Sequence, residues 1–371
     1  MEFMDKGGSM KRVGLMGVLA FVCVGGVQQI EASEQPQLVS ESAILMDAKS
    51  GEVLYDKQGN APMYPASLTK IATTIMALER GDLDTNVRIT EEAIDVVGTT
   101  VFLMEDEELP LEQLVKGMLI NSGNDASSAV ALELSGSKEA FVDEFNEYLQ
   151  TTVGLEDTYF TNPHGLFHEN HVTTAYDLAT LTQYAMQNEE FREMAAIETL
   201  DWQSESWDTT IINHHQLVRD HEEILGVKNG FVSQSGFTLS TFAEVDDTEL
   251  VAITLNAPTA DDTYRDTLEL FRYGFENYAT ETLPEGEQFQ GTDGLTYEAA
   301  DEMFYTTARA NDVTKEVQDG GLLVVKNDDQ VVLEELLTPF EEQTVQAKSE
   351  NKESEDTSFS LFNWIKDLWP W

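Results

Sequence analysis

Cysteine is almost absent from this sequence, and that absence narrows the chemistry available to it. The one cysteine, Cys23, lies inside an apolar stretch over residues 13–27. If export removes this stretch, no cysteine is left, which excludes disulfide bonds and thiolate metal sites. The histidines show no spacing typical of metal ligands, and the adjacent pair His214 and His215 is predicted to lie at the surface. The sequence therefore predicts neither a bound metal nor a cofactor.

Basic residues are also scarce. The chain has 69 Asp and Glu residues against 21 Lys and Arg, a formal net charge of −48. Residues 1–33 hold as many acids as bases, so the rest of the chain carries the whole excess. Proteins that bind nucleic acid need basic patches, so this class is excluded. A large negative charge aids solubility at the cost of self-repulsion, which salt screens. The balance is typical of an extracellular protein from a salty or alkaline habitat.

The sequence has no apolar run long enough to span a bilayer, since its longest covers only residues 13–27. Lys11 and Arg12 precede this run, and the small residues Ala32 and Ser33 follow it. A short basic region, an apolar stretch and a small-residue end are typical of a secretory signal peptide. We therefore predict a signal peptide over residues 1–33 and a secreted mature protein.

A serine and a lysine three residues apart stand at the start of a predicted helix. The stretch over residues 71–79 is largely apolar, and Ser67 precedes it with Lys70. On a helix these two side chains are neighbours, so Lys70 could take the proton of the Ser67 hydroxyl if burial or a second cation destabilises its charge. Taken alone, the pair is more simply explained by a capping serine followed by a solvated lysine.

Two further short motifs follow in the chain. Ser122 and Asn124 lie at a polar junction between predicted helices over residues 114–119 and 126–134, where they could face a cleft or merely form a helix–helix turn. Lys228 precedes Asn229 and Gly230 in a predicted strand, followed by further strands near residues 239–242 and 250–255. A lysine at that strand edge could face Lys70, although Asn-Gly is also a common two-residue hairpin turn.

The order and flanks of these motifs resemble one family. From about residue 43 to residue 275 the chain is similar to the low-molecular-mass penicillin-binding proteins, the serine-type D-alanyl-D-alanine carboxypeptidases. Acyl-serine enzymes of this kind combine a Ser-x-x-Lys, a Ser-x-Asn and a Lys-Thr-Gly type segment, with the first serine as nucleophile. The matching segments here are residues 64–70, 122–126, 162–166, 173–179 and 228–230.

The resemblance implies a catalytic mechanism. Ser67 would attack the carbonyl between the two terminal D-alanines, and Lys70 would be the general base. Ser122 would relay a proton to the departing D-alanine nitrogen, helped by Lys228. The oxyanion would lie between the backbone N–H groups of Ser67 and Phe231. His164 would shape its loop rather than act as a base.

The same resemblance implies which residues bind the substrate. Asn124 would orient the acyl side of the peptide, and Arg265 lies roughly where the family carries an arginine near the terminal carboxylate. The third motif departs from the family at Asn229, which stands where threonine is usual and whose longer, planar amide can also donate a hydrogen bond. The implied substrate-binding residues are Asn124, Lys228, Asn229, Gly230, Phe231 and Arg265.

The predicted fold is an α/β acyl-serine fold, an antiparallel sheet flanked by helices as in β-lactamases and penicillin-binding proteins. We assign residues 34–283 to this catalytic domain, 284–346 to a small β-rich domain and 347–358 to an acidic linker. A hairpin is predicted near residues 322–333. On a helix, residues 359–371 would separate polar from apolar side chains, which favours a peripheral helix at the outer face of the cytoplasmic membrane over a tail docked on its own protein.

The expected function is removal of the terminal D-alanine from peptidoglycan pentapeptides. The expected partners are peptidoglycan stem peptides, β-lactam antibiotics as inhibitors and the membrane surface, with no nucleic acid. A DD-endopeptidase acting on cross-linked peptides would use the same residues. A wall-binding protein with impaired catalysis fits if Asn229 spoils carboxylate recognition. A β-lactamase is less favoured, because the chain shows no clear deacylating glutamate motif.

Overall fold

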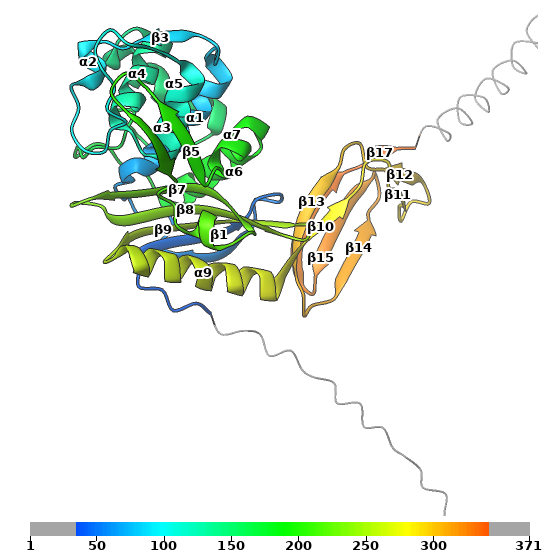
Figure 1. Ribbon diagram of the computed structural model, residues 1–371. Coiled ribbons are helices and arrows are strands. Elements are labelled where there is room, and N and C mark those ends of the chain that lie inside the picture. Colours follow the sequence, from blue (N-terminus) through cyan, green and yellow to red (C-terminus); the bar gives the residue numbers. More distant parts are fainter. Residues whose placement is uncertain (1–34, 341–371) are drawn as a thin grey trace, which may run out of the picture. The chain divides into compact units, whose positions relative to one another are not determined.

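The computed structural model describes residues 35–340 (Figure 1). The predicted signal peptide, the acidic linker and the amphipathic helix over residues 359–371 lie outside these described residues and stay predictions. Within residues 35–340, no helix is both long and apolar enough to cross a membrane.

An antiparallel five-stranded sheet in the order β2-β1-β9-β8-β7 organises the larger part of the structure. Successive side chains of a strand point to opposite faces. In β1, Ile44 and Met46 therefore join a core shared with most of the helices, whereas Ala43 and Leu45 join a second core beneath α9. Figure 1 shows α9 along one face of the sheet and α1, α3, α4, α5, α6 and α7 on the opposite face, whereas Leu217 and Val218 of α8 share the core of α9. The elements are β1 (Ser42–Asp47), β2 (Val53–Lys57), β7 (Ile224–Val232), β8 (Gly236–Val245), β9 (Thr248–Ala257) and α9 (Ala260–Asn277).

The helical region contains the long apolar segments that the sequence predicts as helices. The predicted helices over residues 71–79, 114–119 and 126–134 are confirmed within α1, α3 and α4. Ser137 and Thr174 cap α5 and α6, because each side-chain oxygen accepts a backbone N–H of the first turn. The elements are η1 (Ala66–Leu68), α1 (Thr69–Arg80), α2 (Glu91–Ile94), α3 (Leu111–Ile120), α4 (Asn124–Ser135), α5 (Lys138–Tyr148), η2 (Leu149–Val153), α6 (Ala175–Met186), α7 (Glu189–Ala195) and α8 (Leu217–Asp220).

Two small antiparallel strand pairs complete the part that surrounds the motifs. β3 (Asn86–Arg88) pairs with β4 (Glu108–Pro110) across a connection that contains α2, and β5 (Thr199–Gln203) forms a hairpin with β6 (Asp208–Ile212). The alternative of a hairpin turn at Asn229 and Gly230 is wrong. Both residues lie inside β7, opposite Leu239 and Thr238 of β8, and the chain turns only between Val232 and Gly236.

A β-rich domain follows the sheet and has its own core around Leu283, Tyr297 and Leu323. The predicted hairpin near residues 322–333 is confirmed, since β15 and β16 pair with Asn327 opposite Gln330. The strands are β10 (Tyr278–Leu283), β11 (Gln288–Gln290), β12 (Thr296–Glu298), β13 (Met303–Ala308), β14 (Val313–Val317), β15 (Leu322–Asn327), β16 (Gln330–Leu336) and β17 (Thr338–Pro339).

Candidate active site

Ser67 and Lys70 lie at the start of the buried helix α1. Ser67 is in the 3-10 turn η1 that leads into α1, and Lys70 is one turn further on with no solvent exposure. The Lys70 Nζ is 3.2 Å from Ser67 Oγ, 2.7 Å from Asn124 Oδ1 and 2.8 Å from the His164 carbonyl oxygen. The solvated lysine of the simpler alternative is therefore wrong.

The environment of Lys70 favours its neutral form. Burial and the nearby charge of Lys228 lower the pKa of Lys70 well below its ordinary value of 10.5, against an opposing effect of Asp125. A neutral amine has two N–H donors and one lone pair. The oxygens of Asn124 and His164 can only accept, so they take the two donors, and the lone pair is left for the Ser67 hydroxyl proton. This geometry suits a general base.

The second motif occupies the junction between α3 and α4. Ser122 has a left-handed backbone (φ 66°) and is 7% exposed, and Asn124 is the first residue of α4. The Ser122 hydroxyl makes no hydrogen bond to the described residues, which leaves it available to a substrate. Both polar atoms of the Asn124 amide form a hydrogen bond: its oxygen accepts from Lys70, and one N–H of its Nδ2 donates to the Val97 carbonyl at 2.7 Å.

The third motif lies on β7, the edge strand of the sheet. Lys228 is 1% exposed, and burial lowers its pKa from 10.5 to about 7. Its Nζ donates to the carbonyl oxygen of Asn229 at 3.1 Å and to Asn229 Oδ1 at 3.3 Å. Gly230 contacts the nucleophile turn so closely that a Cβ there would lie 2.8 Å from the Ser67 backbone nitrogen. Phe231 is exposed and packs on Phe237.

Arg265 is the one predicted site residue that points elsewhere. It lies on α9, is 62% exposed, and its guanidinium is paired with Asp262 three residues earlier. Within residues 35–340 it makes no hydrogen bond to any other candidate residue.

A second arginine, which no motif in the sequence singles out, lines the cleft beside Asn229. The cleft has a volume of about 540 Å³, and its lining includes Asn229, His214, Arg219 and Tyr264. Arg219 is exposed and has no ion pair with any described residue. Burial and the charges of Lys228 and Arg219 lower the pKa of His214 to about 4, so its ring is neutral near pH 7. His215, also predicted at the surface, is completely buried, and that prediction is wrong.

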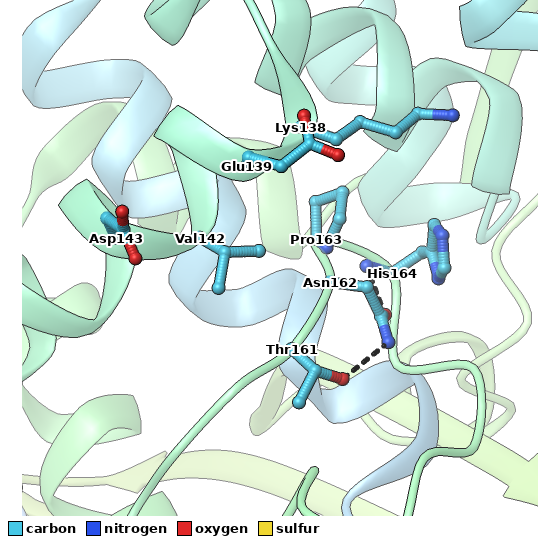
Figure 2. Close-up of a pocket in the computed structure, with 8 residues that line it drawn as sticks. All are labelled: Lys138, Glu139, Val142, Asp143, Thr161, Asn162, Pro163 and His164. Atoms are coloured by element: carbon cyan, nitrogen blue, oxygen red, sulfur yellow. Dashed lines mark hydrogen bonds between the residues drawn. The ribbon is translucent and has the colours of Figure 1, made fainter.

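The loop over residues 161–166 packs against Lys70 and supplies the His164 carbonyl that accepts from its Nζ. The Pro163 carbonyl accepts the hydroxyls of Thr73 and Ser127, so the loop is attached to α1 and α4. Figure 2 shows Asn162, Pro163 and His164 where they line a cavity of about 330 Å³ together with residues of α5. Gly165 (φ 87°) packs on the nucleophile turn, and a Cβ there would be 1.8 Å from the Ala66 oxygen. The loop therefore holds the carbonyl that Lys70 requires.

The chain is similar in sequence to known proteins. The family described as D-alanyl-D-alanine carboxypeptidase matches residues 29–259. The D-alanyl-D-alanine carboxypeptidase DacF of Bacillus subtilis is 31% identical over 251 residues, which are 66% of this chain and 64% of DacF. The chain therefore spans slightly less than two thirds of that relative.

Solved structures agree on the fold of both domains. Penicillin binding protein 5 from Haemophilus influenzae superposes with a TM-score of 0.74 at 25% identity, covering 83% of this chain and 98% of that one. Penicillin binding protein 6B from Escherichia coli gives a TM-score of 0.71 at 25% identity with the same coverage. The family match spans more than half of the sequence, and the chain belongs to the D-alanyl-D-alanine carboxypeptidase family.

Proposed function

We propose that this protein removes the terminal D-alanine from peptidoglycan stem pentapeptides through an acyl-enzyme on Ser67, and that penicillin acylates the same residue. The observation that carries the proposal is the buried Lys70 amine, whose two carbonyl partners direct its lone pair at the Ser67 hydroxyl. Family membership supports the substrate class.

The reaction balances with the residues present. Lys70 takes the hydroxyl proton as Ser67 Oγ bonds to the D-alanyl carbonyl carbon, and the oxyanion is bound by the backbone N–H groups of Ser67 and Phe231. The C–N bond then breaks, and the proton held by Lys70 passes through Ser122, helped by Lys228, to the leaving nitrogen, which returns Lys70 to its neutral form. A water molecule, activated by Lys70, hydrolyses the ester and restores Ser67.

Asn124 has a more specific role than the resemblance alone implies. Both polar atoms of its amide are bonded in the free enzyme, to Lys70 and to the Val97 carbonyl. We therefore assign Asn124 first to holding Lys70 in place. The second N–H of its Nδ2 is left for the acyl side of the substrate.

The terminal carboxylate of the substrate fits the cleft beside Asn229. The Asn229 oxygen is engaged by Lys228, so its N–H donors remain for a carboxylate. Arg219 lines the same cleft without a competing acidic partner among the described residues. Arg265 would first have to leave Asp262. We therefore favour Arg219 over Arg265 as the cation that recognises the carboxylate.

Recognition of the carboxylate can be tested with two arginine variants. Arg219→Gln should raise KM about tenfold for a peptide ending in free D-alanine, the scale of one charge-assisted hydrogen bond, and should leave an amide-capped peptide unaffected. Arg265→Gln is the matched control and should leave both KM values unchanged. A rise only in the Arg265 variant would reverse the assignment.

The same two peptides test the residue that departs from the family. Asn229→Thr should raise turnover of the free-carboxylate peptide, or at least change its preference over the amide-capped one. Equal preference in the variant and the wild type would show that residue 229 does not read the carboxylate.

The proposed activity is tested by measuring D-alanine release from a pentapeptide, alongside a cross-linked dimer and penicillin. Release from the pentapeptide supports the proposal. Cleavage confined to the dimer would assign a DD-endopeptidase. Penicillin binding with no peptide turnover would indicate a wall-binding protein with impaired catalysis, and rapid release of hydrolysed penicillin would indicate a β-lactamase.

We further propose that the mature enzyme is secreted and held at the outer face of the cytoplasmic membrane by residues 359–371. The support is compositional, because Trp364, Ile365 and Leu368 would share one helical face while Lys366 and Asp367 lie opposite. The acidic protein should be repelled by anionic lipid, so attachment must come from apolar burial.

Salt should therefore strengthen binding of the full-length protein to anionic vesicles, because it screens the repulsion. Deleting residues 359–371 should release an active soluble enzyme. Co-sedimentation of the two forms across a salt series measures both effects. Equal sedimentation of the two forms contradicts the anchor, and binding that weakens with salt contradicts this account of its energetics.

A further inference from the structure

We propose that His171 is a positioning residue for the acylation step, a neutral imidazole that fixes the nucleophile turn from the opposite loop. The inference rests on the proposed acyl chemistry at Ser67 and goes beyond it, because His171 lies outside the three motifs. The ring is 2% exposed and stacks on Phe160, with ring centroids 4.8 Å apart and planes 10° from parallel.

One ring nitrogen of His171 accepts a backbone N–H. The Nδ1 atom is 3.0 Å from the Thr161 backbone nitrogen, 3.2 Å from Thr161 Oγ1 and 3.4 Å from Asn162 Nδ2. Figure 2 shows the Thr161 and Asn162 side chains together, joined by a hydrogen bond. A backbone N–H can only donate, so Nδ1 must accept and carries no proton. The ring proton is consequently on Nε2.

The other ring nitrogen reaches the Ser-x-x-Lys motif itself. The Nε2 atom is 2.8 Å from Oγ1 of Thr69, which lies between Ser67 and Lys70. With Nε2 donating, the Thr69 hydroxyl directs its own proton to the Ala66 carbonyl at 2.9 Å. The chain of donors therefore runs from His171 through Thr69 to the residue that precedes the nucleophile.

Ala66 is the residue that requires this support. Its backbone is left-handed (φ 49°), a conformation unfavourable for a residue with a Cβ and maintained only by surrounding structure. The turn at Ala66 sets the direction of the Ser67 Oγ and of the Ser67 N–H. Losing the Thr69 bond would let this turn relax, which would move the attacking oxygen relative to Lys70.

His171 also fixes the loop that holds Lys70. The Thr161 N–H bond attaches the ring to residues 161–166, and this loop supplies the His164 carbonyl that accepts from Lys70. Burial and the charges of His168 and Lys70 lower the pKa of His171 to about 3, so the ring stays neutral over the working range. The uncharged His171 ring thus connects the turn at Ala66 and Ser67 to the loop whose His164 carbonyl accepts from Lys70.

The test compares acylation by penicillin in a set of variants, with the full-length enzyme and separate measurement of binding and of the chemical step. His171→Phe keeps a stacking ring but loses both hydrogen bonds, and should lower the acylation rate constant roughly tenfold to a hundredfold, as expected for small misplacement of reacting groups. Its non-covalent affinity for penicillin should stay near the wild-type value. His171→Gln retains a donor for Thr69 and should recover most of the rate.

Thr69→Val supplies an independent variant if His171→Phe does not fold. It breaks only the Thr69 link and should lose part of that factor, and the double variant should lose no more than His171→Phe alone, because His171→Phe already lacks the Thr69 link. His168→Gln, an exposed histidine of the same loop, is the control and should match the wild type. Additive losses, or wild-type acylation in a folded His171→Phe or Thr69→Val protein, would overturn the proposal. Absence of acylation in the wild type would instead refute the proposed function.

Discussion

Replacing Ser67 with alanine should abolish both penicillin labelling and D-alanine release. The expected loss is complete for labelling, because no other hydroxyl in the described structure is hydrogen-bonded to the Lys70 amine. Intact mass after incubation with penicillin, followed by peptide mapping, measures the adduct and its position. Ser128→Ala is a suitable control, since this buried hydroxyl lies on α4 with no partner among the described residues. An adduct on another residue, or labelling that survives in Ser67→Ala, would contradict acylation at Ser67.

Replacing Lys70 with alanine should slow acylation at least about a hundredfold, the usual contribution of a positioned general base. Lys70→Arg should not restore the rate, because a guanidinium keeps its proton at working pH. Lys116→Ala removes a lysine from an exposed ion pair and should have little effect. Stopped-flow acylation rates measure all three.

The pH dependence of the wild-type rate carries a second check on Lys70. The acylation rate should rise with pH as Lys70 loses its proton. The midpoint of this rise should lie well below pH 10.5, since burial and Lys228 lower the pKa of Lys70. Rapid acylation by Lys70→Arg would show that another group is the base.

The sequence predicts which candidate residues lie together where their spacing is local. Ser67 and Lys70 are one helical turn apart, so a helix is enough to bring them together. The pairing of Lys228 with this helix is a long-range contact, and only the family resemblance supplied it. The strand assignment of Asn229 and Gly230 shows the same limit, because Asn-Gly also suits a turn and the register of β7 against β8 decides the outcome.

Other features of the site leave no signal in the sequence. No motif around Arg219 or Arg265 tells which of the two arginines lines the cleft. The packing of α8, which carries Arg219, and of α9, which carries Arg265, decides it. His171 and His215 are buried, although histidine is a polar residue and no hydrophobic pattern indicates its burial. Ala66 and Ser122 adopt left-handed backbones without being glycine, which residue preferences would not suggest.

The close backbone contacts at Gly165 and Gly230 have a consequence for how this protein can change over evolution. They fix the nucleophile turn between a loop and a strand by main-chain packing, and the working lysines Lys70 and Lys228 are buried. The surface takes little part in placing the reacting atoms. Acidic residues can therefore accumulate over the exterior, where water and salt screen them, without disturbing the catalytic geometry. The charge of the exterior and the geometry of the candidate site can therefore vary independently in this chain.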